Sequence, residues 1–68
     1  GASESSPVMT YVGGVLARVD YASGSYKLMT YTSGLLTQVD YVRGSATARK
    51  TLTYNPDGSL ASVTESNL

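Results

Sequence analysis

The pattern that decides the fold prediction lies in residues 29–41, Met29-Thr30-Tyr31-Thr32-Ser33-Gly34-Leu35-Leu36-Thr37-Gln38-Val39-Asp40-Tyr41. Apolar or aromatic residues stand two positions apart on both sides of Ser33-Gly34. Thr, Tyr and Val favour the pleated surface of a sheet, and glycine readily adopts the left-handed conformation that tight turns need. The stretch therefore predicts two antiparallel strands joined by a short turn.

Similar stretches lie on both sides, over residues 9–21 and 52–65. All of them contain a Tyr-x-x-Gly spacing that recurs about every ten residues, at Tyr11…Gly14, Tyr21…Gly24, Tyr31…Gly34 and Tyr41…Gly44, with a longer version at Tyr54…Gly58. Self-similarity at a fixed period is the first feature to look for, because it sets the fold class. The unit has about twenty residues, and each half of it is one strand and one turn.

We therefore expect an all-β protein, an antiparallel meander of about six strands in three hairpins. The expected strands cover residues 8–12, 15–22, 26–32, 35–42, 47–55 and 59–65. Residues 1–7 are expected to form a disordered N-terminal arm, 8–65 a single β-repeat domain, and 66–68 a tail. A glycine every ten residues would destabilise any helix.

The predicted turns contain Gly14, Gly24, Gly34, Gly44, Pro56 and Gly58. In Asn55-Pro56-Asp57-Gly58, proline presets the first central position and glycine takes the left-handed one. By analogy, Ala22-Ser23-Gly24 and Thr32-Ser33-Gly34 are expected to be three-residue hairpin loops. Residues 43–50 carry three extra residues, which predicts a looser turn or a longer, protruding hairpin.

With such loops, the odd-numbered residues of the first four strands share one face. That face would carry Met9, Tyr11, Val15, Ala17, Val19, Tyr21, Met29, Tyr31, Leu35, Val39 and Tyr41. The last hairpin has one extra residue between Tyr54 and Gly58, so a β-bulge near Asn55 is needed to bring Tyr54 and Val63 to a common face.

Composition points to self-association. A chain of 68 residues forms a marginal core, and without Cys or His it has neither a disulfide nor a Cys/His zinc site to stabilise it. The apolar face could be covered in a closed barrel, by a stacked second copy, or by several copies around an axis; the last two are homo-oligomers. The residues expected in the oligomer interface or core are Met9, Tyr11, Val19, Tyr21, Met29, Tyr31, Val39, Tyr41, Leu52 and Tyr54.

The same composition disfavours several functional classes. Five basic and five acidic residues give no net charge and no basic run, so no nucleic-acid partner is expected, and no apolar run is long enough to span a bilayer. Nucleophiles that depend on His or Cys are excluded. Asp20 and Asp40 are interpreted as residues of a solvated strand face, with Arg18 as a partner, rather than as an acid/base pair or Ca²⁺ ligands. No catalytic residue, metal or cofactor is predicted.

The third copy, Leu52-Thr53-Tyr54-Asn55-Pro56-Asp57-Gly58-Ser59-Leu60-Ala61-Ser62-Val63-Thr64, resembles the YD repeat of the Rhs and teneurin families. The matching positions are Tyr54, Gly58, Leu60 and Val63 or Thr64, with equivalents at Tyr31, Gly34, Leu36 and Val39 and at Tyr11, Gly14, Leu16 and Val19. Asn55, Thr32 or Val12 replaces the Asp after Tyr, and Ser59, Leu35 or Val15 replaces the Arg after Gly. The resemblance implies a strand-turn-strand build and a non-enzymatic scaffold role.

Short Tyr/Gly repeat chains also resemble small phage and prophage products, which implies a virion or tail component. The functional hypothesis is a structural or assembly protein that binds copies of itself, with other virion or cell-surface components as further partners. One alternative is a carbohydrate- or ligand-binding module that uses Tyr26 or exposed tyrosines of the ladder. Another is an excised fragment of a larger YD-repeat protein. The localisation is left open, with virion and extracellular settings both compatible.

Overall fold

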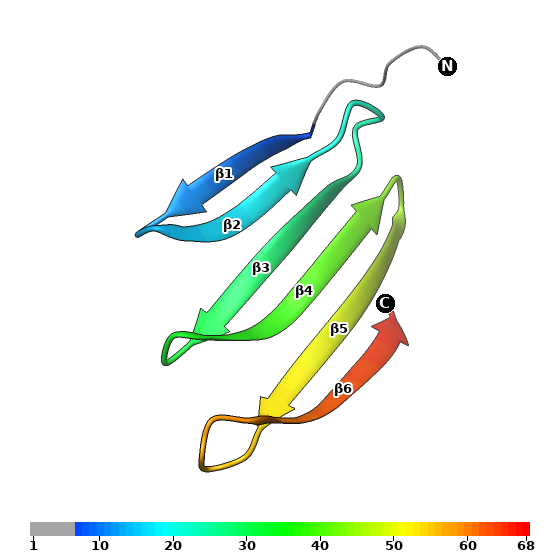
Figure 1. Cartoon of the computed structure of the whole chain (residues 1–68). Coiled ribbons are helices and arrows are strands. Elements are labelled where there is room, and N and C mark those ends of the chain that lie inside the picture. The colour runs from blue at the N-terminus through cyan, green and yellow to red at the C-terminus, as the bar shows by residue number, and fades with distance from the viewer. Residues whose placement is uncertain (1–6) are drawn as a thin grey trace, which may run out of the picture.

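The computed structural model describes residues 7–68, so all of the expected arm over residues 1–7 except Pro7 lies outside the described part. The chain forms one antiparallel sheet in which every strand pairs with the next, in the order β1-β2-β3-β4-β5-β6 (Figure 1). The strands are β1 (Val8–Val12), β2 (Val15–Asp20), β3 (Tyr26–Thr32), β4 (Leu35–Arg43), β5 (Ala46–Tyr54) and β6 (Leu60–Asn67). The prediction of an all-β meander of three hairpins is confirmed.

The first two hairpins close with two-residue turns. Gly13 and Gly14 join β1 to β2, and Ser33 and Gly34 join β3 to β4, all with positive φ. Two left-handed central residues give the turn whose twist matches that of the strands. The prediction of a three-residue loop at Thr32-Ser33-Gly34 is therefore wrong, because Thr32 belongs to β3 and pairs with Leu35.

The turn between β4 and β5 is also tight. Arg43 pairs with Ala46, so only Gly44 and Ser45 lie between the strands, and Gly44 has a φ of 57°. A looser turn or a longer, protruding hairpin was expected over residues 43–50. The turn is not looser; the extra residues lengthen β4 and β5, as the second alternative expected, and their ladder continues through the pairs from Tyr41 to Arg43. β4 and β5 are the two longest strands, with nine residues each.

Three-residue loops occur at the two remaining turns. Tyr21 N–H donates to the Ser25 carbonyl over 2.9 Å, which leaves Ala22-Ser23-Gly24 as the loop. Asn55 N–H likewise donates to Ser59, with Pro56-Asp57-Gly58 between them. Gly24 and Gly58 have φ of 94° and 92°, the left-handed conformation expected for them.

One bulge recurs in each of the pairs β1–β2, β3–β4 and β5–β6, which are the three hairpins. The register shifts between Thr10 and Tyr11, between Thr30 and Tyr31, and between Thr53 and Tyr54. The unpaired extra residues on the opposite strands are Ala17, Thr37 and Ala61. The third bulge brings Tyr54 and Val63 to one face, as expected; the register shifts between Thr53 and Tyr54, next to Asn55, and the extra residue is Ala61 on β6. In the β3–β4 hairpin, a two-residue turn plus a bulge has replaced the expected three-residue loop.

The register defines two faces of the sheet. The tyrosine face carries Met9, Tyr11, Val19, Lys27, Met29, Tyr31, Val39, Tyr41, Ala48, Lys50, Leu52, Tyr54, Val63 and Glu65. The threonine face carries Thr10, Arg18, Asp20, Tyr26, Leu28, Thr30, Gln38, Asp40, Arg49, Thr51, Thr53, Ser62 and Thr64. The prediction that odd-numbered residues share a face fails at Val15 and Leu35, which pair with Val12 and Thr32. Leu16 and Leu36 pair with Tyr11 and Tyr31 instead.

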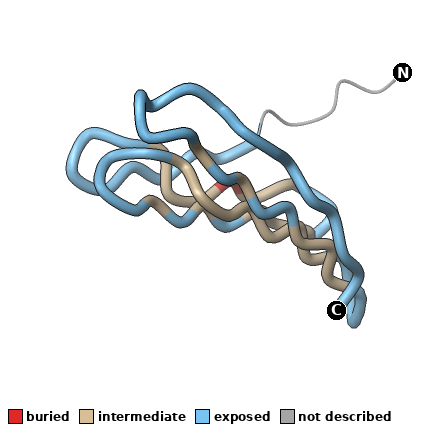
Figure 2. The backbone as a smooth tube through the Cα atoms, turned by 90° about the horizontal axis from the view of Figure 1, so that it is seen from below, coloured by how far each residue is buried: buried red, intermediate tan, exposed pale blue. Residues whose placement is uncertain are grey.

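The sheet is a single layer. Val19 is the one buried hydrophobic residue in the described chain, with 6% exposure, and Figure 2 shows the buried colour at one place only. The radius of gyration is 13.9 Å, whereas a compact domain of this length has about 11 Å. β6 also continues through Asn67, so the expected tail over residues 66–68 is mostly strand.

Candidate interaction surface

The ten residues predicted to form an interface or core lie together. Register places nine of them on the tyrosine face, from Met9 on β1 to Tyr54 on β5. The tenth, Tyr21, follows β2 and its ring meets Tyr41 edge-on, with centroids 6.0 Å apart. On β3, Lys27, Met29 and Tyr31 are half-buried, whereas the alternating residues of the other face are mostly exposed. The side chains of the tyrosine face therefore cover one another, because no second layer does.

Two tyrosines on this face fasten neighbouring hairpins together. The Tyr31 hydroxyl on β3 donates to the Leu16 carbonyl of β2 over 2.9 Å, and the Tyr54 hydroxyl on β5 donates to the Leu36 carbonyl of β4 over 2.5 Å. Both acceptor carbonyls belong to the residue directly before a bulge. The ladders from β2 to β3 and from β4 to β5 end before they reach these residues, so they supply no backbone N–H to either carbonyl. Tyr11 occupies the corresponding place on β1, is 60% exposed, and contacts only the sulfur of Met9 through its hydroxyl.

A hollow of about 410 Å³ lies on the tyrosine face over the later strands. Tyr21, Lys27, Val39, Tyr41, Ala48, Lys50 and Glu65 line it. The Lys27 ammonium lies 5.9 Å from the centre of the Tyr21 ring and 5.3 Å from that of Tyr41, and the Arg43 guanidinium is 5.2 Å from Tyr41. Cations at such distances are attracted to the electron-rich ring faces. The hollow thus combines aromatic surface with positive charge.

Two arginines on the threonine face form ion pairs, whereas the lysines of the hollow form none within the described residues. Among the described residues, the ion pairs join Arg18 to Asp20 and Arg49 to Asp40, both on the threonine face. Lys50 is opposite Glu65 across β5 and β6, but their charged groups form no ion pair. The charges of the tyrosine face are therefore available to a partner.

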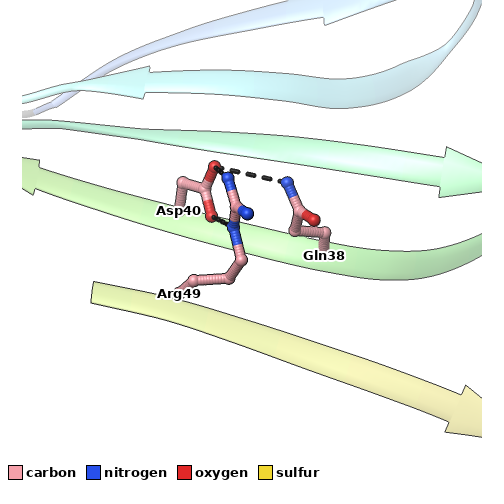
Figure 3. A network of polar contacts seen from close by, with 3 residues as sticks. All are labelled: Gln38, Asp40 and Arg49. Atoms are coloured by element: carbon pink, nitrogen blue, oxygen red, sulfur yellow. Dashed lines mark hydrogen bonds and ion pairs between the residues drawn. The ribbon is translucent and has the colours of Figure 1, made fainter. Parts of the chain in front are cut away.

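The threonine face contains a compact polar network at Asp40 (Figure 3). The carboxylate of Asp40 accepts two hydrogen bonds from Arg49, of 2.8 and 3.0 Å, and one of 3.3 Å from Gln38. The Asp40 side chain is 14% exposed. Hydrogen bonding from Arg49 outweighs the partial burial and lowers the pKa of the Asp40 carboxyl. The cross-strand pair therefore fixes β4 against β5 with Asp40 ionised.

Asp20 makes a similar but more exposed arrangement. Its carboxylate accepts hydrogen bonds of 3.0 and 2.9 Å from Arg18 Nε, which lower the pKa of the Asp20 carboxyl. The same guanidinium lies 4.2 Å from the centre of the Tyr26 ring and covers one face of it. Asp20 and Asp40 thus each form an ion pair with an arginine. In the part of the chain that the structure describes, no group of three His, Cys, Asp or Glu residues is placed to hold a metal ion.

Three features of this surface were missed in the sequence. The carbonyls of Leu16 and Leu36 are backbone groups, and only the bulges free them. Lys27 and Lys50 stand two residues before Met29 and Leu52 and both face a valine, Val19 and Val39, which marks them as equivalent. Their shared spacing was the available signal. Gly13 was also overlooked as a turn residue.

Comparison with protein-family models, with curated proteins and with solved structures gives no match. Residues 7–68 contain no helix long and apolar enough to cross a membrane. The resemblance to YD repeats therefore remains a prediction from the residues quoted above.

Proposed function

We propose that the protein is a non-enzymatic structural protein whose tyrosine face packs against other copies of the chain in a homo-oligomer. The observation that carries this proposal is the single-layer sheet with one buried hydrophobic residue in its described part. A domain ordinarily buries its apolar surface between two layers. Here a second copy would supply the missing layer. The resemblance to phage products extends the proposal to a component of a virion or tail.

The size of the face is sufficient for such packing. The molecule measures 45 × 28 × 20 Å, so one face of the sheet has roughly 1,200 Å², above the ~800 Å² per partner of a standard interface. Met9, Tyr11 and Val63 are still half-exposed or more, at 52%, 60% and 50%. Burying apolar area stabilises by about 25 cal/mol per Å². The tyrosines suit an interface, because Tyr is enriched there.

Two neighbouring residues on β3 provide a matched test. Met29 is on the tyrosine face and Leu28 on the threonine face, where it is 37% exposed. We expect Met29→Lys to shift the protein towards the monomer across a dilution series in light scattering behind a sizing column, because it places a charge inside the interface. Leu28→Lys should leave the mass unchanged. A folded wild-type monomer at every concentration, or equal effects of both substitutions, would contradict the proposal.

A second candidate function rests on the hollow. Its two tyrosines and the cation Lys27 between them suit a sugar ring that carries a carboxylate, since the ring can pack on an aromatic face while the acid meets the ammonium. Titration with an oligogalacturonate, followed by tyrosine fluorescence, tests this candidate. Binding by a monomer that Lys27→Met weakens, with Arg49→Met as the control on the other face, would favour it over self-packing.

A further inference from the structure

The two junctions between hairpins share one register. Between β2 and β3, Arg18 pairs with Leu28, Val19 with Lys27 and Asp20 with Tyr26. Between β4 and β5, the pairs Gln38–Thr51, Val39–Lys50 and Asp40–Arg49 have the same positions relative to the bulge. Each junction also has its tyrosine hydroxyl on a leucine carbonyl, at Tyr31–Leu16 and Tyr54–Leu36. The β2–β3 and β4–β5 junctions are therefore structurally equivalent.

The two outer strands of the sheet, β6 and β1, carry the residues that correspond to the two sides of such a junction, and neither side has a partner strand. Asn55 and Ser59 form a hydrogen-bonded pair, so the next pair, Tyr54–Leu60, is not hydrogen-bonded and the Leu60 carbonyl points away from β5 to the free edge. Leu60 stands at the position of Leu16 and Leu36, directly before the bulge. On the opposite edge, Tyr11 stands at the position of Tyr31 and Tyr54 and bonds no carbonyl.

Val63 continues the same edge of β6. Leu68 N–H donates to the Thr47 carbonyl, and counting alternate pairs inward from there leaves Leu52–Val63 without mutual backbone hydrogen bonds. The N–H and carbonyl of Val63 therefore face outward, as those of Val19 and Val39 do towards Lys27 and Lys50. An exposed edge of this kind is a template for another strand.

We propose that β6 of one copy binds β1 of a second copy, head to tail, in the register of the internal junctions. Val8 of the second copy lies opposite Ser62, and the Tyr11 hydroxyl of the second copy donates to the Leu60 carbonyl. This inference rests on the self-association proposed above but uses the strand edges and not the tyrosine face. The contact is heterologous, so it leaves the same two edges free at the ends of the pair.

Pro7 makes this junction weaker than the internal ones. It occupies the position of Lys27 and Lys50, two residues before Met9 as they are before Met29 and Leu52. Without an N–H, Pro7 cannot donate to the carbonyl of Val63, although its own carbonyl can accept from the Val63 N–H. Half of one backbone pair is lost, and head-to-tail growth is correspondingly limited.

The chain lacks cysteine, so an engineered crosslink tests the register directly. A Val8→Cys protein is mixed with a fluorescently labelled Ser62→Cys protein under mild oxidation, because directly opposite residues place their Cβ atoms within disulfide reach. We expect the mixed disulfide dimer to form at least fivefold faster than with Thr10→Cys in place of Val8→Cys. Equal rates would overturn the inference. So would an intramolecular disulfide in a protein that carries both Val8→Cys and Ser62→Cys.

Hydroxyl removal provides the second test. Tyr11→Phe should weaken association about three- to tenfold in sedimentation velocity, the loss of one hydrogen bond. Tyr26→Phe, on the threonine face, should not weaken it, and Pro7→Ala should strengthen it by restoring the N–H. One outcome separates the two proposals: a discrete oligomer that Met29→Lys dissociates, but whose association Tyr11→Phe and Pro7→Ala leave unchanged. That result would support the proposed function and contradict this inference.

Discussion

The hydroxyl of Tyr31 reaches the carbonyl oxygen of Leu16, fifteen residues earlier in the chain, over 2.9 Å. The two residues belong to neighbouring strands whose regular ladder has already ended at the pair Arg18–Leu28. The side chain therefore closes a gap that the backbone leaves open. Tyr54 does the same for Leu36, eighteen residues earlier.

Removing either hydroxyl should loosen a junction between hairpins. Tyr31→Phe is expected to lower the free energy of unfolding by about 0.5–1.5 kcal/mol, since it leaves the Leu16 carbonyl without this donor. Tyr54→Phe should behave alike. Urea unfolding at one fixed protein concentration measures both. Tyr41→Phe is the control, because its hydroxyl makes no hydrogen bond within the described chain, and a loss of similar size there would contradict the assigned role.

The Asp40–Arg49 pair predicts a pH dependence. The folded-state pKa of Asp40 is lowered by Arg49, so its stabilisation is complete above the unfolded pKa of about 3.9 and disappears as the pH falls through the folded value. Thermal melts should therefore give wild type a higher melting temperature than Asp40→Asn at pH 6, and the difference between the two melting temperatures should close towards pH 2. Asp20 titrates in both proteins and cancels in the difference. A gap independent of pH would show that the carboxylate charge does not stabilise the fold.

The turn at Ser33-Gly34 offers a pair of opposite effects. Ser33 has a φ of 52° and Gly34 one of 81°, so both lie in the left-handed region. Ser33→Asn should stabilise by a few tenths of a kcal/mol, because Asn tolerates this conformation and Asn-Gly is favoured in such turns. Gly34→Ala should destabilise by about 1–2 kcal/mol from the Cβ clash of left-handed backbone. Equilibrium unfolding of the two variants, with opposite signs expected, checks the turn assignment.

Asp57 stabilises the loop between β5 and β6. Its carboxylate accepts hydrogen bonds from the Ser59 hydroxyl over 2.6 Å and from the Ser59 N–H over 2.9 Å, and the hydroxyl contact is the main cause that lowers the Asp57 pKa. Asp57→Ala should shift the urea midpoint downward. Asp57→Asn, which keeps an acceptor oxygen, should recover most of the loss. Identical midpoints for both variants would rule out the acceptor role.

Much of this architecture is legible in the order of residues alone. Tyr and Val in alternation, interrupted by Gly34 and its equivalents, predict strands and their turns because both signals are local to a few residues. The common face of Met9, Val19, Met29 and Val39 follows from the period of two. For the same reason all six strand boundaries agree within two residues, including that of β6, which runs through Asn67 where residue 65 was expected.

The three-dimensional structure decided what depends on contacts across strands. Whether Thr32 closes a loop or pairs with Leu35 changes the local sequence preference little, yet it moved Leu35 to the other face and created the bulge at Thr37. That bulge frees the Leu36 carbonyl, to which Tyr54 binds from eighteen residues away. Such a bond requires a register fixed by the whole sheet, and a short window of sequence does not carry that information.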